Sequence, residues 1–198
     1  MGDEPLAEGS SPQIGPATSV RAFFALPLPD SERMSLGQFV AASAERAPEF
    51  RWTPAANLHL TLRFVGQVER SVVEEVADRL AATSHPAFDL ELGELGTFKR
   101  GRLVRVVWLG LRSGGEAAKT LASEIEAECV KAGLEAEKRR FRAHLTLARA
   151  RSRDGAVLPA LPEPPQLWPW RASELVLYSS RLGRTGSVYE PLRVMQLE

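Results

Sequence analysis

The sequence predicts an α+β fold in a single domain, and three observations support that class. Its 198 residues suit one domain. Hydrophobic residues make up 44% and charged residues 25%, as in folded globular chains. Segments that alternate like strands lie between segments with helical spacing, and the tetrapeptide HLTL occurs twice, 85 positions apart. The repeat indicates two similar halves.

The first half contains two pairs of a strand followed by a helix. Residues 1–19 combine Gly, Ser, Pro and acidic residues without periodicity, so we expect a disordered tail and one domain over residues 20–198. The strand Val20–Leu28 is ended by prolines, and Asp30 and Ser31 offer N-caps for a helix over Glu32–Arg46. Asn57–Val65 alternates as a strand and ends at Gly66, and Ser71–Thr83 has helical spacing.

The second half repeats the mixture. Phe88–Leu92 and Leu103–Leu111 are strand-like, and the turn residues between them predict a hairpin. A helix is expected from Gly115 to about Ala132, because Gly133 stops it. The remaining expected elements are a strand at Phe141–Ala148, a proline-rich loop at Leu158–Pro169, and strands at Glu174–Ser179 and Val188–Gln196.

The charges are divided unequally along the chain. Residues 1–98 hold 7 basic and 14 acidic side chains, whereas residues 99–198 hold 18 and 11. The basic residues of the second half are mostly arginines, whose planar guanidinium groups suit phosphate recognition. Since no apolar run approaches the ~20 residues of a membrane span and the start lacks a signal-like segment, we expect a cytoplasmic protein. Cys129 has no partner for an internal disulfide, and we expect it to be buried.

The two HLTL segments carry the candidate chemistry. Side chains alternate along a strand, so His59, Thr61 and Arg63 are expected on one face and the leucines on the other. His144 and Thr146 repeat this arrangement. If the leucine faces pack on helices, two strands related by approximate twofold symmetry place two imidazoles and two hydroxyls in one cleft.

Such a cleft suits the cleavage of a phosphodiester without a metal or other cofactor. A neutral imidazole can take a proton from water while an imidazolium gives one to the leaving oxygen. Threonine hydroxyls can donate to phosphate oxygens, and an arginine stabilises the developing charge. His85 precedes a proline and lacks the threonine context, so we expect a structural role for it.

The segments around the repeat resemble a known superfamily. NLHLTLRFVG and FRAHLTLARA, together with the opening RAFFALPLPD and the closing LVLYSSRLGRTGSVYEPL, resemble the 2H phosphoesterases over about residues 20–197. Within that superfamily they resemble the bacterial and archaeal RNA 2′,3′-cyclic phosphodiesterases, historically called 2′-5′ RNA ligases.

The resemblance implies a bilobal fold, with two pseudo-symmetric lobes of antiparallel sheet and outer helices around a central cleft. It implies hydrolysis of RNA 2′,3′-cyclic phosphate ends to 2′-phosphates, with reverse 2′-5′ ligation open to the same groups. By analogy, His59 is the general acid, His144 is the base, and Thr61, Thr146 and Arg149 hold the phosphate. The expected partner is an RNA end, neither DNA nor a membrane, and the expected state is a monomer.

Three further assignments depend on which way side chains face. Strict alternation from His144 puts Arg149 on the opposite face, so its role requires the strand to twist or end near Ala148. Alternation instead favours Arg63, a candidate RNA contact beside His59. Phe23 is a candidate platform for an RNA base, although packing in the core is the stronger expectation. Tyr189 is expected to be structural, and the spacing of the four tryptophans selects none of them.

The residues of the sequence leave three alternatives open. A metal-dependent phosphoesterase also uses histidines, but it needs carboxylate ligands that neither HLTL segment contains. A non-catalytic module of the same fold could bind a nucleotide or an RNA end, although it has no need for a complete pair of histidines. Ligation could be the physiological direction, but water at bulk concentration favours hydrolysis.

Overall fold

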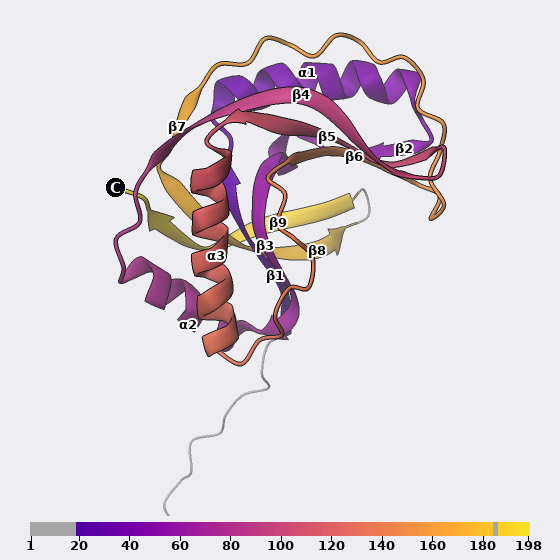
Figure 1. Ribbon diagram of the computed structural model, residues 1–198. Helices are drawn as coiled ribbons and strands as arrows, with labels where there is room; N and C mark the ends of the chain where they lie inside the picture. The colour runs from indigo at the N-terminus through magenta and orange to yellow at the C-terminus, as the bar shows by residue number, and fades with distance from the viewer. Residues whose placement is uncertain (1–18, 184–185) are drawn as a thin grey trace, which may run out of the picture.

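The computed structural model describes residues 19–183 and 186–198 (Figure 1). Of the tail expected over residues 1–19, residues 1–18 lie outside the described part, and Ser19 begins a strand. The helices are α1 (Asp30–Arg46), α2 (Arg70–Ala81) and α3 (Gly115–Lys131), with a short 3-10 turn at Ala55–Asn57. The strands are β1 (Ser19–Pro27), β2 (Phe50–Trp52), β3 (His59–Glu69), β4 (Phe88–Arg100), β5 (Leu103–Ser113), β6 (Leu145–Ala150), β7 (Trp170–Ala172), β8 (Glu174–Gly183) and β9 (Gly186–Gln196).

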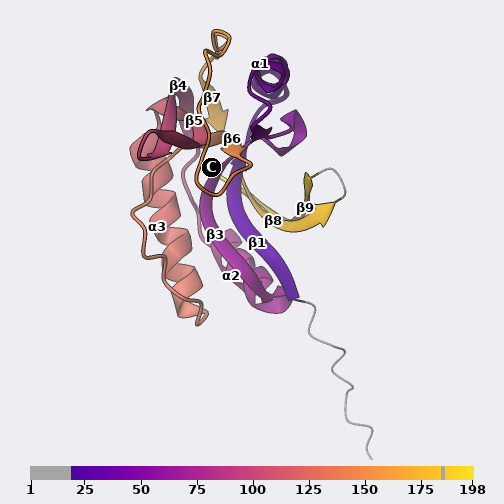
Figure 2. The same cartoon turned by 90° about the vertical axis from the view of Figure 1, so that its right-hand side faces the viewer.

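These strands form one antiparallel sheet in the order β7-β4-β5-β6-β3-β1-β8-β9, and β2 pairs with β6 outside this path. The two HLTL segments lie at the middle of the order, where β3 and β6 pair through Leu60 and Leu145. Four strands lie on each side of this junction, which confirms the α+β class and its two similar halves. The sheet is curled, so that β8 and β9 turn away from β4 and β5 (Figure 2).

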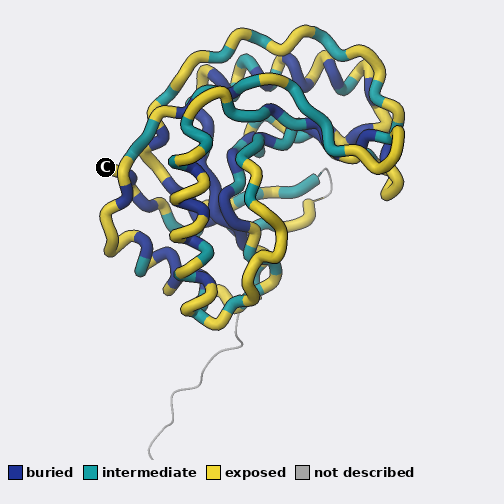
Figure 3. Tube along the Cα trace, in the orientation of Figure 1, coloured by how far each residue is buried: buried dark blue, intermediate teal, exposed yellow. Residues whose placement is uncertain are grey.

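Two hydrophobic cores lie on the same face of the sheet, one for each half. Leu60 belongs to the first core, in which β1, β3 and β8 pack against α2 and α3. Leu145 belongs to the second core, in which β2, β5 and β6 pack against α1. Buried segments accordingly run through the central strands and the inner sides of the helices (Figure 3). Because Leu60 and Leu145 face the helices, their polar neighbours lie on the opposite face of the sheet.

Most of the expected elements are present, with shifted ends. The three helices, the β4–β5 hairpin and the loop over Leu158–Pro169 are confirmed. The expectation that the second strand ends at Gly66 is wrong, because Gly66 takes a positive φ of 86° beside a bulge and β3 continues to Glu69. Residues 141–144 are not part of β6, since the ladders with β3 and β5 begin only at Leu145. The three-residue strands β2 and β7 are too short to be recognised from alternation.

Candidate active site

The register between β3 and β6 brings the four motif residues together. Leu60 and Leu145 are direct partners in an antiparallel pair. Counting outward from them, His59 lies across from Thr146, and His144, the residue directly before β6, comes next to the position of Thr61. Side chains directly opposite in such pairs have Cβ atoms about 4.5–5.5 Å apart. The twofold arrangement expected from the repeat therefore holds for the backbone at this junction.

A β-bulge follows each threonine at the same position of the motif. In β3, Arg63 pairs with Phe24 of β1 and Thr61 pairs with the next residue, Ala25. Leu62, between them, is therefore an extra residue without a partner in β1. In β6, Ala148 pairs with Val107 of β5 and Thr146 pairs with the next residue, Trp108. Leu147, between them, is therefore an extra residue without a partner in β5. The Leu147 carbonyl accepts a hydrogen bond from the Thr53 backbone N–H at 2.8 Å. Each bulge resets the alternation, so the residues beyond it change faces.

The bulge in β6 places Arg149 on the histidine side of the sheet. Leu147 and Ala148 are both buried in the second core, and Arg149, which follows them, is exposed on the opposite face. Burial is the main cause that lowers the pKa of both His59 and His144, and the positive charge of Arg149 lowers both further, as a cation near both imidazoles does. The conflict between alternation and the expected position of Arg149 is thus resolved by one extra residue in the strand.

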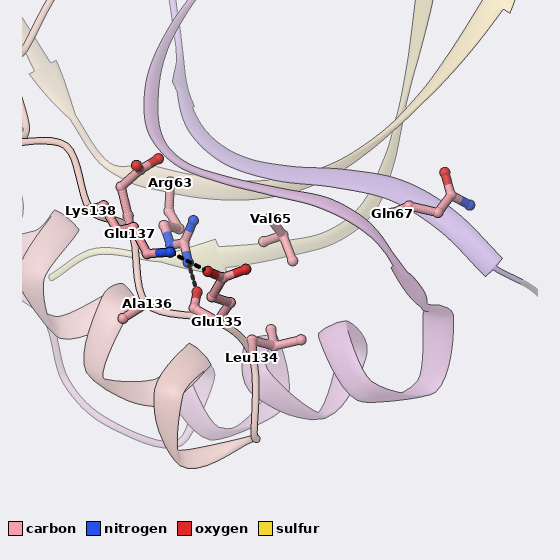
Figure 4. A pocket seen from close by; sticks show the side chains of 8 residues that line it. All are labelled: Arg63, Val65, Gln67, Leu134, Glu135, Ala136, Glu137 and Lys138. Atoms are coloured by element: carbon pink, nitrogen blue, oxygen red, sulfur yellow. Dashed lines mark hydrogen bonds and ion pairs between the residues drawn. The ribbon is translucent and has the colours of Figure 1, made fainter.

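The same bulge in β3 sends Arg63 to the helix side, so the expectation that it lines the site beside His59 is wrong. Arg63 is only 8% exposed and forms an ion pair with Glu126 of α3. Its Nη1 donates to the carbonyl of Phe64 at 2.6 Å, and its Nη2 donates to the carbonyl of Glu135 at 2.7 Å. Figure 4 shows this side chain against the connection that follows α3, where it lines a cavity of about 360 Å³. The counterpart of Arg149 in the first motif is Phe64, which is 39% exposed.

Phe23 lies beneath His59 and is not available to stack on an RNA base. Its ring is 2% exposed and stacks on the His59 ring with centroids 4.8 Å apart. Tyr178 and Tyr189 complete its surroundings, with ring centroids 5.3 and 4.9 Å from that of Phe23. The candidate platform is therefore a support for His59. The two tyrosines come from β8 and β9, and no local pattern in the sequence links them to the motif.

A different aromatic pair supports His144. The Phe98 ring meets the imidazole edge-on at 5.2 Å, and the Trp108 ring does so at 6.2 Å. Trp108 lies across Gly96 of the neighbouring strand, where a Cβ would come within 2.3 Å of the indole. A glycine at position 96 is therefore required for this indole position. Trp108 is the tryptophan, among the four, that lies beside a motif histidine.

Both imidazoles are held in the same way. The Nδ1–H of His59 donates to the carbonyl of Asn57 at 2.7 Å, and that of His144 donates to the carbonyl of Arg142, also at 2.7 Å. Each histidine thus bonds the residue two positions before it. With Nδ1 carrying a proton, Nε2 accepts a proton when the ring is neutral and donates one when it is charged. Either ring can therefore act as a base or as an acid.

The surroundings favour the neutral form of both rings in the free protein. Burial lowers the pKa of His59 from 6.5 to about 4, with Arg149 adding to the effect and the bond to Asn57 opposing it. Burial also lowers the pKa of His144, helped by Arg149 and Arg142. Arg149 also has a lowered pKa, because neighbouring atoms remove part of its guanidinium group from water and because Arg139 and Arg105 add positive charge nearby. An anion bound among these groups would raise the pKa of both histidines.

The other candidate residues lie away from this site. His85 is buried, with Nδ1 2.8 Å from a Glu124 oxygen and Nε2 3.0 Å from the Leu80 carbonyl, which confirms its structural role. Cys129 is fully buried, as expected. Among residues 19–183 and 186–198, no three His, Cys, Asp or Glu side chains are grouped so as to hold a metal ion. None of the helices in this part of the chain is long and apolar enough to cross a membrane.

A curled antiparallel sheet with two H-x-T-x strands at its centre is the architecture of the 2H phosphoesterases. Residues 31–184 match the model of the 2′-5′ RNA ligase superfamily, and the chain belongs to that superfamily. It is 31% identical over 175 residues to an RNA 2′,3′-cyclic phosphodiesterase of Escherichia coli, covering 87% of this chain and 94% of that relative. A relative of the same name from Aeropyrum pernix is 34% identical over 142 residues, covering 69% of this chain and 80% of its own. The crystal structure of E. coli LigT with 3′-AMP superposes with a TM-score of 0.78 at 29% identity, covering 91% of this chain and 99% of that one.

Proposed function

We propose that this protein is an RNA 2′,3′-cyclic phosphodiesterase that hydrolyses cyclic phosphate ends to 2′-phosphates with two histidines and no metal ion. The names of its relatives support the activity. The observation that carries the mechanism is the duplicated geometry: two imidazoles, each with Nδ1 bonded to a carbonyl, on adjacent strands beside two threonines and one arginine.

The roles carried over from the family give a balanced reaction. Nε2 of His144 takes a proton from water, and the resulting hydroxide attacks the phosphorus. The bond from phosphorus to O3′ breaks, and Nε2 of His59 gives its proton to O3′. The hydroxyls of Thr61 and Thr146 donate to the non-bridging oxygens, and Arg149 stabilises the charge that develops on them. The products are a 3′-hydroxyl and a 2′-phosphomonoester.

The acid must be charged when the substrate is bound, although burial holds its pKa near 4 in the free protein. The phosphate anion supplies the opposite charge that raises this pKa, so the proton enters with the substrate. We therefore expect substrate binding at neutral pH to be accompanied by proton uptake. Calorimetric titration with a 2′-nucleotide in buffers of different ionisation enthalpy measures this uptake directly.

RNA is the proposed substrate because a 2′,3′-cyclic phosphate requires the ribose 2′-hydroxyl, which DNA lacks. The same groups can join a cyclic end to a 5′-hydroxyl by the reverse path, and bulk water favours hydrolysis. A monomeric state and a cytoplasmic location remain predictions from the sequence.

A short RNA with a 2′,3′-cyclic end tests the proposal. His59→Asn and His144→Asn should each lower turnover by about 10²–10⁴-fold, the usual contribution of a positioned proton donor or acceptor. Circular dichroism checks that the variants are folded, and wild type is assayed alongside. Near-normal turnover in either variant would refute the two-histidine mechanism. Binding without turnover by the wild type would instead support a non-catalytic module.

A further inference from the structure

Two arginines stand directly opposite one another beside the active site. Arg51 of β2 and Arg149 of β6 are partners in an antiparallel pair. Their neighbours Phe50, Trp52 and Ala148 are buried in the second core, so both arginines point away from it. Arg51 therefore lies on the same face of the sheet as Arg149 and the motif histidines.

This pairing is unfavourable without a further charge. Like charges directly opposite in a sheet destabilise the pair. Across residues 19–183 and 186–198, neither Arg51 nor Arg149 forms an ion pair with a carboxylate. Arg105 of β5 adds a third positive charge: it is the extra residue at a bulge between Val106, the partner of Arg149, and Val104. Because Val104 is buried in the second core, the exposed Arg105 points to the face of Arg149. Its charge helps to lower the pKa of Arg149.

Several arginines are compensated by a carboxylate, whereas these three belong to the described arginines that form no ion pair, a group that also includes Arg102, Arg142 and Arg151. Arg100 pairs with Asp154, Arg112 pairs with Glu91, and Arg139 pairs with Glu137. Uncompensated guanidinium groups that converge on one face suit phosphate oxygens, which they bind through charge-assisted hydrogen bonds. The reacting phosphate occupies only the part of this surface next to the histidines, where the proposed function employs Arg149.

We propose that Arg51 and Arg105 bind a second phosphate, the phosphodiester on the 5′ side of the terminal nucleotide. This inference rests on the proposed function and narrows its substrate class to oligonucleotide ends. The terminal cyclic phosphate lies between the histidines, and the preceding nucleotide extends along β6 toward β2. A cyclic mononucleotide fills the first position only and forgoes the contacts with Arg51 and Arg105.

The test compares adenosine 2′,3′-cyclic phosphate with the dinucleotide that carries one further adenosine on its 5′ side. The wild type should have a kcat/KM at least tenfold higher for the dinucleotide. Arg51→Gln and Arg105→Gln should each reduce this ratio at least threefold, and the double variant should bring it close to one. Arg51→Lys should restore part of the ratio, because it returns the charge without the planar fork. Arg70→Gln, an exposed arginine at the start of α2, is the matched control and should leave the ratio unchanged.

Salt dependence gives a second readout. The slope of log affinity against log salt for the dinucleotide should fall by about 0.7 for each single-strand phosphate contact removed. A ratio in the double variant equal to that of the wild type would overturn the second phosphate site while leaving the proposed function standing. If the wild type hydrolyses neither substrate, both the proposed function and this inference are refuted.

Discussion

Replacing Arg63 with alanine should destabilise the fold and leave the chemistry nearly intact, because Arg63 lies on the helix side of the sheet. The side chain holds three parts of the chain together. It pairs with Glu126 of α3, donates to the carbonyl of Glu135 in the connection after α3, and donates to the carbonyl of Phe64 beyond the bulge. Glu126 also accepts a hydrogen bond from the backbone N–H of Glu137 at 2.8 Å.

The size of the effect follows from burial. Removing one partner of a buried ion pair costs about 3–5 kcal/mol, because the other charge is left without compensation. Glu126 is 27% exposed and keeps its bond from Glu137, so the lower end of that range applies. A loss of roughly 3 kcal/mol corresponds to a fall in Tm of about 6–12 °C for a chain of this size.

Thermal and urea unfolding of Arg63→Ala measure this loss, and Glu126→Ala with the double variant completes a cycle that isolates the coupling between the two side chains. Arg70→Ala breaks an exposed helical pair with Glu74 and is the control, with an expected cost of about 0.5 kcal/mol. A loss below about 1 kcal/mol in Arg63→Ala would refute the buried network. Unchanged stability combined with weaker RNA binding would instead restore Arg63 to the histidine side.

Three further predictions concern the histidines and their supports. Because the pKa of His59 falls from 6.5 to about 4 on folding, the unfolded chain binds the proton more readily, so stability is complete above pH 6.5 and declines as the pH drops toward 4. His59→Asn should flatten this decline in thermal unfolding scans, and an equally steep decline would contradict the burial of that ring. Gly96→Val should lower both Tm and turnover, since its side chain would occupy the position of the Trp108 indole, and wild-type kinetics would show that the indole is not needed there. His85→Ala should lower the free energy of unfolding while turnover at 25 °C stays within about twofold, and a large loss of turnover in folded protein would give His85 a role in the reaction.

The sequence predicted the central pair of strands because the HLTL repeat places the same residues at the same phase. It could not predict the bulges, since an extra residue is defined only against a partner strand that lies far away in the chain. One signal was present: Ala148 stands where alternation calls for a polar residue. In the first motif the corresponding residue is Arg63, whose charge suggests the polar face. It is nevertheless buried, because a long side chain can bury its apolar stem while its charged end pairs with a carboxylate.

The burial of Phe23 agrees with the stronger of its two sequence expectations, but its stacking on His59 could not be predicted from alternation. All five residues from Ala22 to Leu26 are buried, because β1 is a central strand covered on both faces, so alternation does not distinguish them. The cover on the histidine face comes from Tyr178 and Tyr189, whose positions depend on the pairing of β1 with β8 and of β8 with β9. Such pairings join segments that are distant in the chain, so local alternation in the sequence does not predict them.

The most direct test of the account is the identity of the product formed in the presence of EDTA. A short RNA ending in a 2′,3′-cyclic phosphate is incubated with the protein, digested with a nuclease and compared with 2′- and 3′-nucleotide standards. We expect a 2′-phosphate at an undiminished rate, because His59 protonates O3′ and no metal takes part. A 3′-phosphate product would mean that the acid and base roles of the two histidines are exchanged. Activity that EDTA abolishes and that Mn²⁺ or Zn²⁺ restores would contradict the two-histidine mechanism.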